Sequence, residues 1–188
     1  VKKWELKFGF TETLKLCRTL LMKNDMYIRL NVEKLNIEEM HFILLKDEIN
    51  VSEYKDLKYF FKVNSGREKI LENSLFTSGI ISIQDPASGA VVNLVDPQKD
   101  EFILDACAAP GTKSLLMAQK VGINGKIYAY DINQNRVSQG KKDILRHNYK
   151  NIDWCVADAS KGEYPTYNKI LIDAPCSGTG VIGRRPDI

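Results

Sequence analysis

Four short apolar runs of this sequence each end in an acidic residue. They are residues 102–104 before Asp105, 127–130 before Asp131, 155–157 before Asp158 and 170–172 before Asp173. Helical segments separate the first three runs, and an alternation of helices with continuously apolar strands is typical of a parallel, doubly wound α/β sheet. In such sheets ligands bind at the carboxyl ends of the strands. We therefore expect the four carboxylates to face one crevice.

Residues 1–76 predict a small α+β module in front of that sheet. The predicted elements are a helix with apolar residues at 14, 17 and 21, a strand at 26–30, a helix at 36–45 and a strand at 59–63. The second helix is predicted from Asn36 and Glu39, which form a capping-box pattern. Residues 77–188 then form the sheet domain, in which Asp85 and Pro86 mark the start of a helix.

The composition is that of a soluble globular protein. Of 188 residues, 44% are hydrophobic and 27% are charged, as in an ordinary folded domain. No apolar run approaches the roughly 18 residues of a membrane span, and the first residues are too polar for a signal peptide. The four cysteines form no Cys-x-x-Cys pair. We expect a cytoplasmic protein with no metal and no membrane contact. Its net charge of +3 permits a nucleic-acid partner without requiring one.

The first motif, residues 105–114, reads Asp-Ala-Cys-Ala-Ala-Pro-Gly-Thr-Lys-Ser and joins a strand to a helix. Its small residues let the backbone approach a ligand at the helix N-terminus. The single Gly111 fits neither Gly-x-Gly-x-x-Gly nor a P-loop. Asp131 lies about 20 residues further on, where a carboxylate binds ribose hydroxyls. The pattern favours a nucleoside with a charged, phosphate-free tail, S-adenosylmethionine. The alternative is an ordinary strand-to-helix turn.

The second motif, residues 173–180, begins Asp-Ala-Pro-Cys. Carbon 5 of cytosine is a weak nucleophile. It becomes reactive when a thiolate adds to carbon 6 while a carboxylic acid hydrogen-bonds ring nitrogen 3. Asp173 and Cys176 are therefore the predicted catalytic pair. The alternative for Cys176 is a buried structural cysteine, which is what we expect of Cys17 and Cys155.

Residues 80–188 resemble the Sun (RsmB-like) family of S-adenosylmethionine-dependent RNA cytosine-5 methyltransferases. The segments that carry the resemblance are 84–88, 105–113, Asp131 with Arg136, Asp158, and 173–188. Residues 4–35 are similar to the segment before the catalytic domain in that family. The resemblance implies a Rossmann-like methyltransferase sheet, incomplete at its C-terminal half, after the small α+β module. It also implies methyl transfer from S-adenosylmethionine to carbon 5 of a cytosine in RNA, with ribosomal RNA the favoured substrate.

The same resemblance implies which residues form the site. Cofactor contacts are implied for Cys107, Ala108, Ala109, Pro110, Gly111, Thr112, Lys113, Asp131, Arg136, Asp158 and Asp173. In that set Asp131 binds the ribose, Asp158 lies near the adenine, and Asp173 borders both cofactor and cytosine. Thr112 stands where the family usually has a second glycine.

Cys176 has a different role in the Sun family, where it serves release of the methylated RNA. The family's attacking cysteine lies in a later Thr-Cys motif. This sequence ends at Ile188, before that motif, so we expect a fragment that lacks the nucleophile and is inactive alone. Two alternatives stay open: a non-catalytic RNA-binding fragment, and a DNA cytosine-5 methyltransferase with Cys176 as its nucleophile. The sequence leaves the oligomeric state open.

The N-terminal module also offers a candidate RNA contact. Its basic residues are Lys62, Arg67 and Lys69, which follow the aromatic residues Tyr59, Phe60 and Phe61. RNA bases stack on aromatic rings, and basic side chains bind phosphates. The alternative, which is the more common arrangement, is a solvated charged face beside core aromatics.

Overall fold

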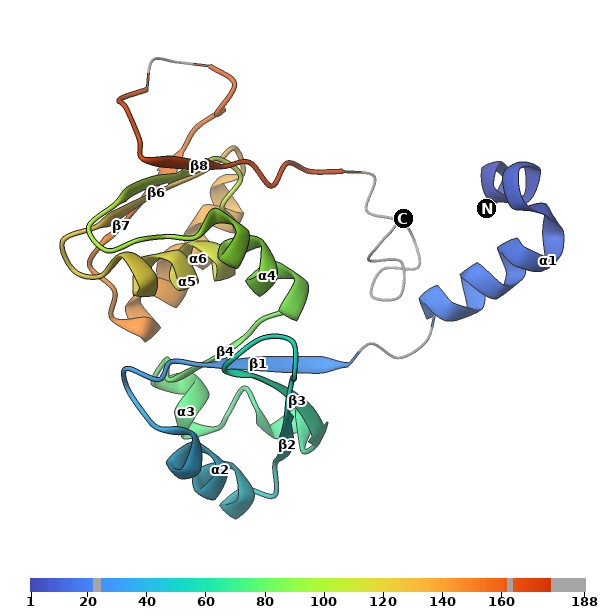
Figure 1. The fold of residues 1–188 in the computed structure, drawn as a ribbon, viewed down its shortest axis with the longest axis horizontal. Helices are drawn as coiled ribbons and strands as arrows, with labels where there is room; N and C mark the ends of the chain where they lie inside the picture. The colour runs from blue at the N-terminus through green and yellow to red at the C-terminus, as the bar shows by residue number, and fades with distance from the viewer. Residues whose placement is uncertain (22–24, 162–163, 177–188) are drawn as a thin grey trace. The chain divides into compact units, whose positions relative to one another are not determined.

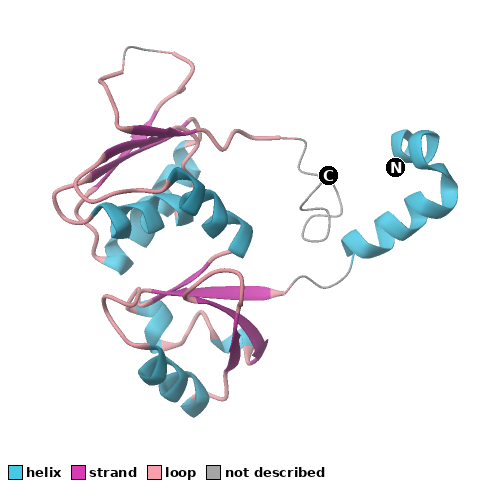
Figure 2. Ribbon diagram, viewed as in Figure 1, coloured by secondary structure: helices cyan, strands magenta, loops and turns pink. Residues whose placement is uncertain are grey.

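The computed structural model describes residues 1–21, 25–161 and 164–176 (Figures 1 and 2). Residues 26–174 form one compact unit, and helix α1 (Lys2–Leu21) belongs to a second. α1 includes the predicted apolar positions and is kinked at Gly9, where φ is 77°. Glycine adopts this left-handed conformation without the strain that a Cβ atom would add. No helix in the described part of the chain is long and apolar enough to cross a membrane.

An antiparallel sheet of four strands, in the order β2-β3-β1-β4, forms the first half of the large unit. The strands are β1 (Met26–Leu30), β2 (Asn50–Glu53), β3 (Phe60–Ser65) and β4 (Ile81–Ile83), and the helices are α2 (Ile37–Lys46), the 3-10 turn η1 (Arg67–Lys69) and α3 (Ser74–Thr77). The side chain of Asn36 caps α2 by accepting a hydrogen bond from the Glu39 amide at 2.8 Å. The predicted strand at 26–30 and the predicted helix at 36–45 are confirmed.

This module has two features that the sequence did not indicate. Its fourth strand, β4, pairs with β1 and lies beyond residue 76, where we placed the domain boundary. For Phe60 and Phe61 the structure shows the more common alternative, core aromatics, because these side chains are only 3% and 1% exposed and cannot stack on bases. Phe61 packs in the core of the antiparallel sheet, and Phe60 packs in the core of the second sheet. Of the three neighbouring aromatic residues, only Tyr59 is exposed.

A parallel sheet of four strands, in the order β7-β6-β5-β8, forms the second half and confirms the predicted α/β class. The strands are β5 (Phe102–Asp105), β6 (Lys126–Asp131), β7 (Ile152–Val156) and β8 (Lys169–Leu171), and the helices are α4 (Pro86–Val95), α5 (Thr112–Val121) and α6 (Gln134–His147). All three helices lie on one face of the sheet (Figure 2). β6 buries every second residue, namely Ile127, Ala129 and Asp131, on that face.

The last two strands begin earlier than the apolar runs predicted. β7 starts at Ile152 rather than at residue 155, and β8 starts at Lys169 rather than at residue 170. β7 tolerates Asp153 because its carboxylate lies 2.6 Å from the Nζ of Lys126 on the neighbouring strand. The expectation of a buried Cys155 is wrong. Its side chain is exposed because it lies on the face of the sheet opposite the helices. Cys17 is half-buried.

A buried polar network joins the two sheets. The guanidinium of Arg29, which is 3% exposed, donates from Nε to Gln84 at 2.7 Å and from Nη1 to Gln119 on α5 at 2.8 Å. Gln119 in turn donates to Asn31 at 2.9 Å, and Asn31 donates to the hydroxyl of Tyr149 at 3.0 Å. Both partners of Arg29 are neutral amides. Burial lowers the pKa of Arg29 to about 10, so the side chain stays charged at neutral pH.

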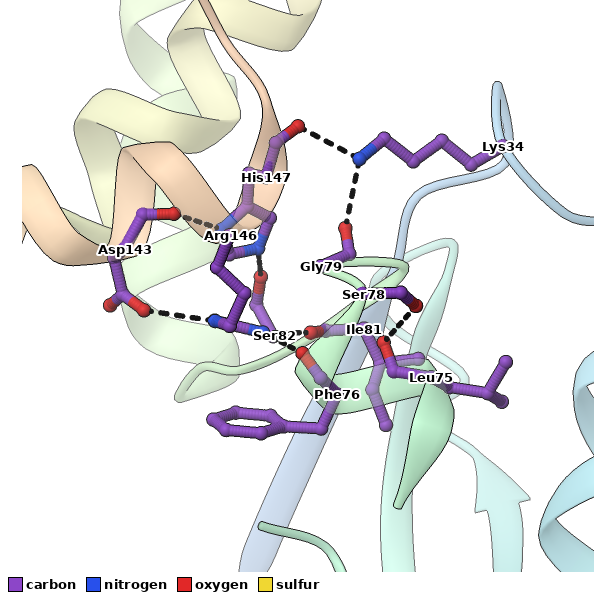
Figure 3. Close-up of polar contacts among 10 residues, drawn as sticks. All are labelled: Lys34, Leu75, Phe76, Ser78, Gly79, Ile81, Ser82, Asp143, Arg146 and His147. Atoms are coloured by element: carbon purple, nitrogen blue, oxygen red, sulfur yellow. Dashed lines mark hydrogen bonds and ion pairs between the residues drawn. The ribbon is translucent and has the colours of Figure 1, made fainter. Parts of the chain in front are cut away.

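A second set of contacts holds the end of α6 against the antiparallel module (Figure 3). The Nδ1 of His147 lies 2.8 Å from the carbonyl oxygen of Asp143, and its Nε2 lies 2.7 Å from the hydroxyl of Ser82. A carbonyl oxygen only accepts, so Nδ1 carries the proton and Ser82 donates to Nε2 of a neutral ring. Lys34 donates to the carbonyl of His147 at 2.8 Å. Arg146 donates to the carbonyl of Ile81 at 3.1 Å and also to that of Phe76.

These contacts of His147 predict a pH-dependent contribution to stability. Burial lowers the pKa of His147 from 6.5 to about 4, so the unfolded state binds more protons than the folded state between these values. The contribution of the neutral His147 to the free energy of unfolding is complete above about pH 6.5. It is lost as the pH falls toward 4, and the loss amounts to at most about 3 kcal/mol.

The measurement is urea unfolding of the wild type and of His147→Gln across that pH range. Burial raises the pKa of Asp105 to about 6, and this group titrates in the same range with the opposite effect on stability. The difference between the two proteins therefore isolates the imidazole. We expect the free-energy advantage of the wild type to shrink as the pH falls. A difference that does not change with pH would contradict the assignment of a neutral, buried His147.

Candidate cofactor-binding site

The loop of the first motif crosses the carboxyl edge of the parallel sheet. The amide of Ala106 donates to the carbonyl of Leu171 in β8 at 2.9 Å, and the amide of Ala108 donates to that of Tyr130 in β6 at 2.8 Å. Gly111 then begins α5 with a φ of 111°. Ala108 and Ala109 are buried and Pro110 is exposed. The loop is thus fixed to strands on both sides of β5, so its position depends on the pairing of the sheet.

Two glycines make room for the indole ring of Trp154, which lies on β7. A Cβ atom on Gly111 would lie 2.8 Å from Cζ2 of Trp154, and one on Gly140 in α6 would lie 2.3 Å from the same atom. Both distances are shorter than side chains tolerate. Trp154 therefore packs against the start of α5 and against α6 at once. Gly111 is therefore required by this packing, and its expected contact with a ligand stays a prediction.

Asp105, the last residue of β5, is one of the four strand-end carboxylates expected to face the crevice, but it is not among the cofactor contacts that the resemblance implied. Its side chain is 1% exposed, and its Oδ2 accepts a hydrogen bond from the hydroxyl of Ser114 at 2.7 Å. Its Oδ1 is buried and has no hydrogen-bond partner among the described residues. Burial raises the pKa of this carboxyl to about 6. The sequence signal that could have identified Asp105 as a cofactor contact was its position, because it ends a strand and is the first residue of the first motif.

Asp131 at the end of β6 is held by its neighbours. Its Oδ2 accepts from the amide of Ala109 at 3.1 Å, and its Oδ1 accepts from the amide of Asn133 at 2.9 Å. The guanidinium of Arg136 lies 3.4 Å from Oδ2 and also donates to the carbonyl of Ala109. Three of the predicted cofactor residues therefore lie in contact. A carboxylate oxygen can accept more than one hydrogen bond, so Asp131 keeps the capacity to bind a hydroxyl.

An ion pair brings the two motifs together. The Nζ of Lys113, in the first turn of α5, lies 2.7 Å from Oδ2 of Asp173, which follows β8. The Lys113 side chain is 19% exposed and that of Asp173 is 52% exposed, so the pair borders solvent. The structure thus places Asp173 beside the predicted cofactor loop.

Asp158 follows β7 at the same edge of the sheet. The amide of Ala157 donates to the carbonyl of Asp131 at 3.2 Å, which sets the end of this strand beside the end of β6. The hydroxyl of Ser160 donates to Asp158 at 2.6 Å, and the Nζ of Lys161 lies 3.3 Å from its other oxygen. The bond from Ser160 is the main reason why the pKa of this half-buried carboxyl is lowered.

The two cysteines of the motifs differ in their surroundings. Cys107 is half-buried, and burial raises the pKa of its thiol, so it is a neutral group beside the loop at pH 7. The side chain of Cys176 is exposed. Asp173 belongs to the large unit and Cys176 to the other. The pairing of these two residues in catalysis therefore stays a prediction. Residues 177–180 of the second motif lie outside the described residues.

The residues at this edge fit S-adenosylmethionine. The unpartnered Oδ1 of Asp105 can accept a hydrogen bond from an amino group, and Asp131 can accept from ribose hydroxyls. Carboxylates also favour a ligand with sulfonium and ammonium charges. Among the described residues, no group of three or more His, Cys, Asp or Glu side chains is arranged to hold a metal ion. Fold and site together define a Rossmann-like domain of the S-adenosylmethionine-dependent methyltransferase class.

Comparison with known proteins specifies the family. A family model described as 16S rRNA methyltransferase RsmB/F matches residues 92–188. A probable ribosomal RNA small subunit methyltransferase B from Bacillus subtilis is 34% identical over 192 residues, which cover 100% of this chain and 42% of the relative. The crystal structure of PH0851 has a TM-score of 0.85 at 29% identity, covering 97% of this chain and 42% of that one. NSun6 from Pyrococcus horikoshii, solved with SFG, shares the fold with a TM-score of 0.80 at 18% identity, covering 96% and 72%.

The chain belongs to the RsmB/F family of 16S rRNA methyltransferases, because the family model matches more than half of it. The resemblance to the Sun (RsmB-like) family that the sequence showed is therefore confirmed. The family uses S-adenosylmethionine. The chain spans about two fifths of the length of its Bacillus relative.

The contact of Trp154 with two glycines can be tested by Gly140→Ala. A new Cβ atom 2.3 Å from the indole ring must displace it, at a cost of about 1–3 kcal/mol. This cost exceeds the gain in helix propensity of roughly 1 kcal/mol. We expect the free energy of unfolding to fall in Gly140→Ala and to change little in Ser138→Ala, an exposed control on the same helix.

A double-mutant cycle identifies the partner. Because Trp154→Leu removes the ring that the new methyl group meets, Gly140→Ala should be tolerated better in that background. An equal loss of stability in both backgrounds, measured by urea unfolding, would show that the glycine is needed for another reason.

Proposed function

We propose that this chain binds S-adenosylmethionine at the carboxyl edge of its parallel sheet and takes part in methyl transfer to carbon 5 of a cytosine in small-subunit ribosomal RNA. The observation that carries the proposal is the ion pair between Lys113 and Asp173. It joins the cofactor motif to the motif expected to hold the cytosine. Membership of the RsmB/F family supports the reaction, and the Bacillus relative is described as a small-subunit ribosomal RNA methyltransferase.

The residues of the first motif and of the strand ends hold the cofactor in this proposal. Asp131 accepts hydrogen bonds from the ribose hydroxyls, and its contacts with Ala109 and Arg136 keep its carboxylate oriented. Oδ1 of Asp105 accepts a hydrogen bond from an amino group of S-adenosylmethionine. Asp158 lies near the adenine of the cofactor. When bound, S-adenosylmethionine supplies an electrophilic methyl carbon on a sulfonium centre.

The second motif orients the base in this proposal. Lys113 pairs with Oδ2 of Asp173, and Oδ1 of this carboxylate accepts a hydrogen bond from the exocyclic amino group of the cytosine. By resemblance to the family, a cysteine of a Thr-Cys motif adds to carbon 6, which raises electron density at carbon 5. Also by resemblance, Cys176 acts after methylation. It helps to remove the proton from carbon 5, so that the bond between carbon 6 and the enzyme breaks and the double bond returns.

The role of Asp131 can be tested by isothermal titration with S-adenosylmethionine. We expect Asp131→Ala to weaken binding by about 1–3 kcal/mol, because the ribose hydroxyls lose a charged acceptor. Asp153→Ala is the matched control, since this carboxylate lies on β7 and pairs with Lys126. Circular dichroism melting of each variant shows whether the fold is intact.

Two results would contradict the proposal. One is a folded wild-type chain that binds no S-adenosylmethionine. The other is an Asp131→Ala variant with the affinity of the wild type, which would remove this residue from the cofactor site.

A further inference from the structure

A cavity lies away from the carboxyl edge of the parallel sheet, at which the cofactor site is proposed. Its volume is about 500 Å³, within the range of roughly 300–1,000 Å³ that is usual for ligand sites. The lining residues that matter are Arg29, Lys58, Tyr59, Asn93, Gln119 and Lys120. They come from β1, from the turn before β3, and from the second halves of α4 and α5. Because α5 begins at the cofactor loop, this cavity is at the other end of that helix.

The charges that line the cavity favour an anion. Arg29 is almost fully buried, and its hydrogen bonds go to two neutral amides. No ion pair among the described residues compensates its charge, and a buried charge without a counterion is costly. Lys58 and Lys120 add positive charge, while Asp56 is the one carboxylate among the described lining residues. A bound phosphate would supply the missing negative charge.

Tyr59 adds an aromatic surface at some conformational cost. It has a φ of 66°, a left-handed conformation that is unfavourable for a bulky side chain. The backbone is held there by a hydrogen bond of 2.9 Å from the amide of Leu30 to the Tyr59 carbonyl. The side chain is nonetheless 43% exposed and lines the cavity, so it is not placed there to fill the core. Strain of this kind is typical of residues that bind ligands.

We propose that this cavity binds one nucleotide of a single-stranded RNA segment, whose base stacks on Tyr59 and whose phosphate lies toward Arg29, Lys58 and Lys120. Aromatic stacking combined with basic side chains is how proteins hold single-stranded nucleic acid. The inference rests on the proposed function, since it takes RNA as the substrate. It adds a contact remote from the cofactor, which would fix the RNA on the antiparallel module and α5 together.

The first test is fluorescence anisotropy with a labelled single-stranded RNA decamer and the full chain. Tyr59→Gly removes the ring, and glycine tolerates the positive φ, so the variant should fold at least as well as the wild type. We expect its RNA affinity to fall about fivefold or more. Phe42→Ala is the matched control, because Phe42 is an exposed aromatic residue of the same module that does not line the cavity. A combination of full stability and weaker RNA binding is not expected of a merely structural tyrosine.

The second test concerns the phosphate. Lys120→Gln should weaken binding and lower the slope of log affinity against log salt by about one, because one phosphate contact is lost. Lys142→Gln, an exposed lysine on α6 outside the cavity, serves as the control for net charge. A free cytidine 5′-monophosphate should displace the decamer only at concentrations far above those of the decamer itself.

The outcomes separate this inference from the proposed function. Equal RNA affinities for Tyr59→Gly and Phe42→Ala, or no RNA binding by the wild type, would overturn the nucleotide site. Displacement by the free mononucleotide at the decamer's own concentration would assign the cavity to a small nucleotide instead of RNA. Titration with S-adenosylmethionine is independent, since Tyr59 is not part of the cofactor site. Its failure in the wild type would overturn cofactor binding by this chain, whereas weaker RNA binding by Tyr59→Gly than by Phe42→Ala would still locate an RNA contact in the cavity.

Discussion

The in-register parallel pairing of β5 with β6 and β8 is the constraint on which the site depends. Asp105 pairs with Ala129 on one side and with Leu171 on the other, so the strands end at one edge. The cofactor loop is hydrogen-bonded to the two outer strands of this trio, and α5 leaves from its last residue. A shift in register of either neighbour would move the loop and separate the carboxylates.

The antiparallel module is attached to this sheet through buried polar groups. Arg29 and His147 lie at the centre of the two sets of contacts, and both are almost fully buried. Buried polar groups in such positions fix the orientation of the module relative to the parallel sheet. Each would lose its hydrogen-bond partners if the two packed surfaces moved past one another. Within residues 26–174 the module is therefore held in one orientation relative to the cofactor loop. That arrangement lets a surface of the module and α5 form a joint cavity.

The sequence predicted those parts whose signal is local. Continuous apolar runs mark buried parallel strands, and the capping pattern at Asn36 located α2. β2 and β4 were not predicted from the sequence. These strands are only four and three residues long, which is too short for a recognisable alternation of apolar and polar residues. The burial of Phe60 and the strained backbone of Tyr59 depend on tertiary packing, which no local pattern records. For the same reason Asp105 looked like the end of a strand, and its unpartnered oxygen became visible only in the structure.

Hydrogen–deuterium exchange with and without S-adenosylmethionine tests whether the cofactor binds at the carboxyl edge of the parallel sheet, and it needs no substitution. We expect bound cofactor to slow exchange in the loop and first turn of α5, residues 106–115, and after β6, residues 131–136. Exchange in the antiparallel sheet should be unchanged. Protection confined to the antiparallel module, or no protection in either segment at saturating ligand, would contradict a cofactor site at the carboxyl edge of the parallel sheet.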